Sequence, residues 1–107
     1  MILLAWTTVS TRTDADRIAA GAVESNVALC VQIDGPVISH YRWQGRLEQK
    51  SEFRLMFKCL PERRLQLETC VHALHPYSIP EWFVVEADYV SEKYLSWART
   101  DAHSLPL

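Results

Sequence analysis

Apolar and polar positions alternate along much of the chain, and this alternation predicts β-strands. Residues 2–9 form an apolar, β-branched run, and residues 28–34 have the same character. In residues 51–60 apolar side chains occupy every second position, which is the period of a half-buried strand. Gly35 and Pro36 follow the second run, and because this pair fits poorly within a regular ladder we expect a bulge or bend there.

Two further segments have the spacing of amphipathic helices. Between Thr13, the expected N-cap, and Asn26, apolar side chains recur every three or four positions. A second such segment begins at Pro61, a residue favoured in the first helical turn, and its apolar face reaches Leu74. A short C-terminal helix is expected over residues 91–99, capped by its first serine.

The order of these elements predicts the fold class. After the expected bend, the chain continues extended to residue 43, turns around Gly45 and returns, which makes a long β-hairpin. A fourth strand is expected over residues 82–89. The βαββαβ order with a short terminal helix is that of a ferredoxin-like α+β fold, and 107 residues suit a single domain spanning 1–107.

The first and last predicted strands are apolar on both faces. Large apolar side chains alternate between the two sides in residues 2–6, and residues 82–85 repeat the pattern. Two helices cover only one face of such a sheet, so the second face requires cover from elsewhere. The long hairpin also offers strand edges that would aggregate if left bare. We therefore expect a homo-oligomer.

Charge and cysteine content limit the partners and the location. With 11 Lys and Arg against 13 Asp and Glu, no basic face for a nucleic acid is evident. No run approaches the ~20 apolar residues that span a membrane, and the apolar start lacks the features of a signal peptide. Cys30, Cys59 and Cys70 form no CxxC pair and fit free thiols in a reducing compartment. We expect a cytoplasmic protein that binds neither nucleic acid nor membrane.

Cys70, His72 and His75 form a candidate metal-binding run. Residues two apart on a helix point about 200° away from each other, so Cys70 and His72 do not share one ion. Cys70 also lies on the apolar face, where a small core side chain is the alternative interpretation. His75 follows the helix end, where it can cap carbonyls, pack, or bind an ion with a ligand from elsewhere.

The loop LHPYSIPEW, residues 74–82, is a candidate active site. His75, Tyr77 and Glu81 include the side-chain types used in general acid–base catalysis. No nucleophile with a glycine-rich elbow or oxyanion loop accompanies them, and the two prolines indicate a loop whose shape is fixed. We therefore expect a protein that is not an enzyme.

Four motifs resemble the CutA family of divalent-cation tolerance proteins. They follow one another in the order and spacing of that family, over about residues 3–98: ALCVQI, SHYRWQGRLEQKSEFRLMFK, LHPYSIPE and YLSW. The resemblance implies a ferredoxin-like homotrimer whose long hairpins pair across subunits, similar in architecture to the PII signalling proteins. It agrees with the oligomer expected from the two-sided strands.

The resemblance also implies tolerance of, and binding to, copper or another divalent cation. The implied ligands are a cysteine at the end of the first strand and a histidine pair before the Pro-Tyr of the loop. Here the first strand ends in AWTT and has no cysteine, and Leu74 occupies the position of the first histidine of the pair. His75 matches the second position, and Cys70 corresponds to a cysteine of some relatives. His75 and Cys70 are therefore the candidate metal ligands.

By analogy with PII-like trimers, we expect a small ligand or metal ion to bind at clefts between subunits. The residues assigned to these clefts are Tyr41, Trp43, Glu52, Lys58, His75, Tyr77 and Glu81. The RNP1 signature that would direct Tyr41 and Trp43 to RNA is absent, so packing against another subunit is the expected use of these rings. The alternative function is a structural or signalling interaction trimer without a dedicated metal site.

Overall fold

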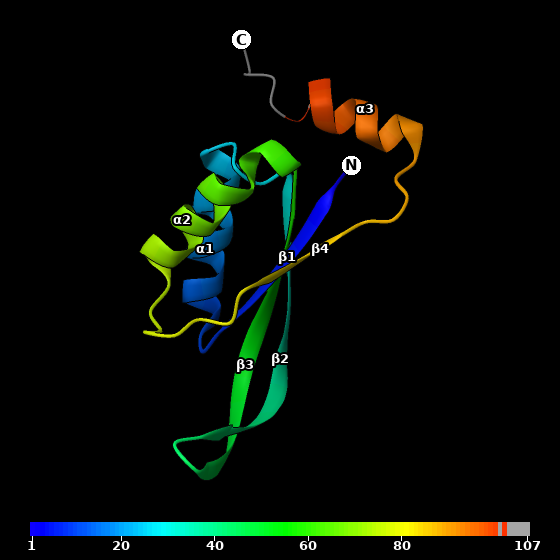
Figure 1. The fold of residues 1–107 in the computed structure, drawn as a ribbon. Coiled ribbons are helices and arrows are strands. Elements are labelled where there is room, and N and C mark those ends of the chain that lie inside the picture. The colour runs from blue at the N-terminus through cyan, green and yellow to red at the C-terminus, as the bar shows by residue number, and fades with distance from the viewer. Residues whose placement is uncertain (101, 103–107) are drawn as a thin grey trace.

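The computed structural model describes residues 1–100 and 102. Over this range the elements are β1 (Leu3–Val9), α1 (Arg12–Glu24), β2 (Cys30–Trp43), β3 (Arg46–Cys59), a 3₁₀ turn (Pro61–Arg63), α2 (Arg64–Leu74), β4 (Phe83–Glu86) and α3 (Glu92–Thr100). The predicted βαββαβ order and terminal helix are confirmed (Figure 1). Within the described part of the chain, no helix is long and apolar enough to cross a membrane.

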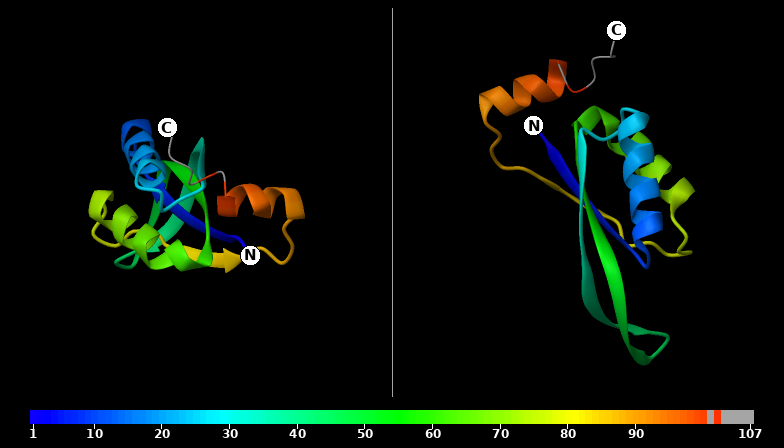
Figure 2. Two further views of the ribbon diagram at one scale, coloured as in Figure 1. Left: turned by 90° about the horizontal axis from the view of Figure 1, so that it is seen from above. Right: turned by 180° about the vertical axis from the view of Figure 1, so that it is seen from behind.

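The strands form one antiparallel sheet in the order β2-β3-β1-β4. β1 is central: Leu3 lies opposite Cys59 of β3 on one side and Glu86 of β4 on the other. This strand order confirms the ferredoxin-like topology. α1 and α2 lie side by side against one face of the sheet (Figure 2). The opposite face is called the outer face below.

The main hydrophobic core lies between the sheet and these two helices. Its fully buried members include Ala5, Val9, Ala15, Ile18, Ala22, Leu55, Phe57, Leu67 and Val71. The alternation in residues 51–60 is confirmed, because Leu55, Phe57 and Cys59 are buried here. Each large apolar side chain buried in this way contributes roughly 1.5–3 kcal/mol to folding.

α1 begins earlier than predicted. Its N-cap is Thr11, whose Oγ1 accepts a hydrogen bond from the backbone N–H of Asp14 at 3.1 Å, and the predicted cap Thr13 lies inside the helix. Both threonines precede an aspartate by three residues, so the capping pattern alone did not distinguish them. The helix ends at Glu24, and Asn26 beyond it has a left-handed φ of 60°.

The predicted boundaries of α2 and β4 also need correction. Pro61 opens a single 3₁₀ turn, and the α-helix starts after it. β4 is shorter than the predicted 82–89, because only four of its residues have partners on β1. The pairing runs from Phe83 opposite Trp6 to Glu86 opposite Leu3. Beyond Glu86 the chain leaves the sheet toward α3, which does begin after the predicted serine cap.

The predicted bulge at Gly35 and Pro36 is confirmed. Asp34 lies opposite Arg54, whereas Val37 lies opposite Glu52, so β2 carries one more residue than β3 across this step. Gly35 has a φ of 137°, which residues with a side chain rarely adopt.

The extra residue decides which side chains face outward along the rest of β2. Side chains of an uninterrupted strand alternate, so even-numbered residues after Asp34 would stay on its face. With one residue added, the odd-numbered residues lie on that face instead, opposite Glu52 and its neighbours. Tyr41 and Trp43 therefore lie on the outer face.

The hairpin extends well beyond the rest of the sheet. β1 pairs with residues 53–59 of β3 only, so residues 37–52 project as a two-stranded arm (Figure 1). The arm closes through Gln44 and Gly45, which have φ values of 50° and 79°. At the opposite end of the sheet, α3 packs Ala98 in a smaller core with Ile2 and other apolar residues.

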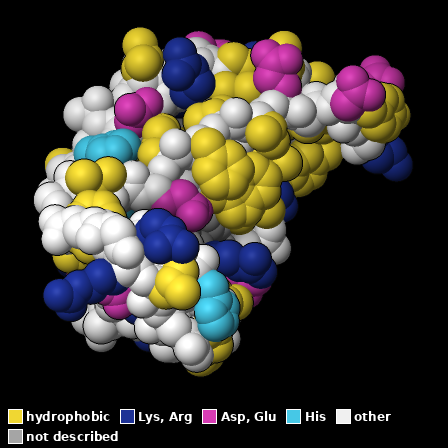
Figure 3. All heavy atoms as spheres, turned by 60° about the horizontal axis from the view of Figure 1, so that its bottom comes forward, with side chains coloured by type: hydrophobic (Ala, Val, Ile, Leu, Met, Phe, Trp, Pro, Cys, Tyr) yellow, Lys and Arg dark blue, Asp and Glu magenta, His cyan; other side chains and the backbone are white. Residues whose placement is uncertain are grey.

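Large apolar side chains remain uncovered on the outer face. Trp6 stacks on Phe83 with ring centroids 5.2 Å apart, yet Phe83 is 49% exposed and Val85 is 44% exposed. A view that brings the arm end forward shows apolar side chains gathered at the surface (Figure 3). The two-sided apolar pattern of β1 and β4 is thus confirmed, and the homo-oligomer inferred from it stays a prediction.

Replacing Gly35 with alanine is expected to destabilise the fold by about 1–3 kcal/mol, because φ is positive and a Cβ would lie 3.0 Å from the Glu52 carbonyl oxygen. Gly45→Ala is the matched control, since φ there is 79° but nothing lies within 4 Å of a Cβ. Its cost is expected to be smaller, about 1 kcal/mol. Urea unfolding of both variants measures the difference, and equal losses would contradict the close contact at the bulge.

Candidate functional site

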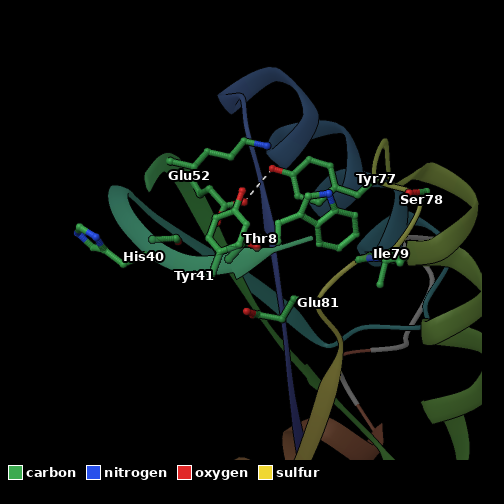
Figure 4. A pocket seen from close by; sticks show the side chains of 12 residues that line it. Thr8, His40, Tyr41, Glu52, Tyr77, Ser78, Ile79 and Glu81 are labelled. Carbon is green, nitrogen blue, oxygen red and sulfur yellow. Dashed lines mark hydrogen bonds between the residues drawn. The ribbon is translucent and has the colours of Figure 1, made fainter. Parts of the chain in front are cut away.

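A cleft of about 730 Å³ lies between the arm and the loop that follows α2. The residues that line it are Thr8, Ser39, His40, Tyr41, Trp43, Lys50, Glu52, Tyr77, Ser78, Ile79, Pro80 and Glu81. Tyr41, Glu52 and Tyr77 approach one another from three segments, while His40 points away from them (Figure 4). Five predicted cleft residues therefore meet here, and sequence reasoning missed Thr8, Lys50 and Ile79.

Glu52 is the buried charge of the cleft. Its side chain is only 6% exposed, and the Tyr77 hydroxyl donates a hydrogen bond to its Oε2 at 2.8 Å. Ser10 Oγ lies 2.7 Å from the same Tyr77 oxygen. Among the described residues, no Lys, Arg or His forms an ion pair with Glu52. Lys50, whose Nζ lies over the Tyr77 ring, interacts electrostatically with Glu52 without forming an ion pair, so with Glu81 the cleft keeps a net negative charge.

His75 supports the loop and does not line the cleft. Its Nδ1 accepts the backbone N–H of Tyr77 at 3.1 Å, so Nε2 carries the proton and donates to the Thr8 carbonyl at 3.0 Å. The Thr7 hydroxyl also lies 3.0 Å from Nε2. Burial lowers the pKa of His75 and favours the neutral ring. Both ring nitrogens are thus engaged within the protein, and the ring holds Tyr77 in reach of Glu52.

The lysine of the cleft is Lys50, whereas the sequence pointed to Lys58. Both lie on the outer face of β3, but Lys58 is six residues from Glu52, which corresponds to ~20 Å of strand. Lys58 lines a separate hollow of about 270 Å³ together with Leu4 and residues of the 87–94 segment. The Nζ of Lys50 lies 4.3 Å from the ring centroid of Tyr77. Lys50 could have been found from the sequence, because it lies two residues before Glu52 and alternation along the strand places both side chains on the same face.

Glu81 brings a second carboxylate to the cleft. Burial raises its pKa, the charge of Glu52 adds to this shift, and Arg54 opposes it. Arg54 is itself held by Asp34, with one guanidinium nitrogen 2.7 Å from a carboxylate oxygen. Glu52 and Glu81 therefore repel each other, and neither is paired with a cation among the described residues.

Aromatic and apolar side chains form the walls. Tyr41 and Trp43 leave the arm on the outer face and remain 41% and 45% exposed. Ile79, from the facing loop, is 69% exposed. Surfaces of this kind bind apolar or cationic groups through contact area and ring electrostatics.

Cys70 lies away from these walls. It packs against the main core from α2, and burial raises the pKa of its thiol, which disfavours the thiolate that binds metals. Its side chain is hydrogen-bonded to Ser25, whereas His75 is directed toward β1. Within residues 1–100 and 102, no group of three or more His, Cys, Asp and Glu side chains could hold a metal ion. The metal-ligand roles of His75 and Cys70 stay predictions.

Residues 3–101 match the family described as CutA1 divalent ion tolerance protein. The divalent-cation tolerance protein CutA of Thermus thermophilus is 36% identical over 92 residues, which cover 86% of this chain and 89% of that protein. The CutA homologue of Xenopus laevis is 33% identical and covers 87% of this chain and 62% of its own length.

Solved structures with the same fold carry the same family name. The structure of CutA from Synechococcus elongatus superposes with a TM-score of 0.89 at 37% identity, covering 96% of this chain and 90% of that one. The divalent cation tolerance protein from Thermus thermophilus superposes with a TM-score of 0.88 at 34% identity, covering 92% and 96%.

Glu81→Gln is expected to stabilise the protein at pH 7. The raised pKa means that the folded chain binds the Glu81 proton more tightly than the unfolded chain does, so stability is lost as pH rises through that pKa. The amide removes this loss, and the gain should vanish near pH 4, where the unfolded side chain also takes up its proton. Urea unfolding at both pH values measures this. Glu86→Gln, which removes the same charge from an exposed position on β4 outside the cleft, is the matched control.

Proposed function

This chain belongs to the CutA1 divalent ion tolerance family, and we propose that it acts in divalent-cation tolerance as a homotrimer that binds copper, another divalent ion or a small ligand at its clefts. It is a binding protein of the cytoplasm and carries out no catalysis. The clefts lie where subunits of a PII-like trimer meet, and each chain contributes the arm and the 77–81 loop.

The observation that supports this function best is the buried carboxylate of Glu52. It is 6% exposed, lines the cleft together with Glu81 and Lys50, and forms no ion pair within the described chain. A bound cation would neutralise this charge and relieve the repulsion between the two carboxylates. Carboxylate oxygens suit hard divalent ions, whereas copper prefers nitrogen and sulfur, the donor types of His75 and Cys70.

The trimer is supported by the uncovered apolar residues of the outer face. Phe83 and Val85 are 49% and 44% exposed in the single chain, and they continue from β1 onto β4. Apolar patches of this kind usually mark interfaces. β2 is an edge strand along the whole arm, with unpaired backbone groups suited to a neighbouring strand.

The exposed apolar outer face and the small number of possible metal ligands also favour a second function, in which the trimer binds another protein. With no three-ligand group in the part of the chain the structure describes, the trimer could instead present a surface to a signalling partner. In that case every divalent ion leaves the melting temperature unchanged at high excess.

The assembly is tested by its mass in solution. Light scattering is expected to give about three times the 12.3 kDa of one chain. Val85→Glu places a charge on the outer face and is expected to dissociate the assembly, because an unpaired buried charge costs several kcal/mol. Leu65→Glu, at a 66% exposed position on α2, is the control and should leave the mass unchanged. A monomeric wild type would contradict the proposal.

Metal binding is tested by titrating Cu²⁺ and Zn²⁺ into wild type and four variants, with calorimetry reporting ions per trimer. Glu52→Gln and Glu81→Gln remove the charge of the cleft and are expected to weaken binding about tenfold or more. His75→Ala and Cys70→Ser test the ligands that the family resemblance implies for copper.

The four variants separate the two locations of the ion. Loss in the glutamine variants alone assigns the ion to the cleft, and loss in His75→Ala or Cys70→Ser alone assigns it to the other pair. Unchanged stoichiometry in His75→Ala excludes a metal role for that histidine. If no variant and no wild type binds either ion, the metal function fails.

A further inference from the structure

The cleft is larger than a metal ion requires. An ion coordinated by oxygen lies 2.0–2.6 Å from its ligands, whereas the cleft encloses about 730 Å³, within the range of sites for small organic molecules. Besides Glu52 and Glu81, the lining includes the rings of Tyr41, Trp43 and Tyr77 and the aliphatic side chain of Ile79, none of which is a usual ligand of a divalent ion. A cleft of this size has room for a small organic molecule.

The charge of the cleft indicates the sign of that occupant. Glu52 is more than nine-tenths buried, is directed into the cleft, and has the Tyr77 hydroxyl as its one hydrogen-bond partner among the described residues. Glu81 lies close enough to interact with it electrostatically. Arg54, which interacts electrostatically with Glu81, is hydrogen-bonded through two guanidinium nitrogens to Asp34. With the Lys50 ammonium beside Glu52, the two carboxylates still leave the cleft one positive charge short.

The walls indicate the body of the occupant. The rings of Tyr41 and Trp43 are half-exposed and line the cleft together with Ile79, which is 69% exposed. A cation over such rings gains ~0.5–2 kcal/mol, and an apolar group gains contact area. Thr8 and Ser39 add hydroxyl acceptors to the lining. Several oxygen acceptors favour an ammonium group with N–H donors over a quaternary one.

We propose that this cleft binds a small organic monocation, a primary ammonium ion on an apolar or aromatic body, with the ammonium on Glu52 and Glu81 and the body against Tyr41 and Trp43. This inference rests on the proposed function, because it names the ligand class of the same cleft. Lys50 limits the class: its ammonium already lies over the Tyr77 ring, 4.3 Å from the centroid, and repels a second positive charge. Single amines are therefore expected to bind in preference to polyamines and guanidinium-rich peptides.

The test uses 2-phenylethylammonium and its neutral analogue 2-phenylethanol as probes, titrated by calorimetry into the full chain in its native assembly at pH 7. The ammonium ion is expected to bind saturably, and the alcohol at least tenfold more weakly, because it cannot neutralise the carboxylates. Glu81→Gln is expected to weaken binding of the ammonium ion about tenfold, and Trp43→Leu is expected to weaken it severalfold. Glu86→Gln carries the same charge change outside the cleft and should leave binding unchanged.

Three results would overturn the inference. The first is equal binding of the alcohol, which would show an apolar cleft without charge selection. The second is ammonium binding that Glu81→Gln and Trp43→Leu leave unaltered. The third is no saturable binding to the assembly, as when a second copy of the chain fills the cleft. The Cu²⁺ and Zn²⁺ titrations separately decide the metal function, so a protein that binds the ions but not the amine loses this inference alone.

Discussion

The backbone of Gly35 lies so close to that of β3 that a Cβ on it would be 3.0 Å from the Glu52 carbonyl oxygen. This approach is possible because the residue has no side chain, and it allows β2 to carry one extra residue without leaving the sheet. The extra residue decides which side chains of β2 lie on the outer face between the bulge and the end of the arm. Tyr41 and Trp43 share a face with Glu52 because of it, and the same step lies directly against the backbone of the buried carboxylate.

The second wall of the cleft depends on hydrogen bonds that begin in β1. Thr8 accepts from His75, His75 accepts from the N–H of Tyr77, and the Tyr77 hydroxyl donates to Glu52. The loop after α2 is therefore joined to the central strand and to the arm by one continuous chain of polar contacts. A histidine used in this way must stay neutral, and its burial lowers its pKa in that direction.

Much of the fold could be predicted from periodicity, since buried faces impose their spacing on the sequence. The bulge could be predicted from Gly35 and Pro36, and the two-sided apolar strands from the residues of β1 and β4. The cap of α1 could not, because Thr11 and Thr13 each precede an aspartate by three residues and so satisfy the same pattern. The sequence pointed to Lys58 for the cleft because alternation places Lys50 and Lys58 on the same face of β3. The 77–81 loop lies beside only the arm end of that face, so Lys50 lines the cleft and Lys58 lines a separate hollow.

The sheet combines pairings of very different sequence separation. β2 and β3 are joined through Gln44 and Gly45 and can pair as soon as the turn forms, on the timescale of microseconds typical of hairpins. β4 pairs with β1 across residues 3 and 86, so its docking requires closure of most of the chain. We expect the arm to acquire its register early and β4 to join last. Between formation of the hairpin and docking of β4, the arm presents long unpaired strand edges. Two newly made chains would therefore first contact each other through their arms.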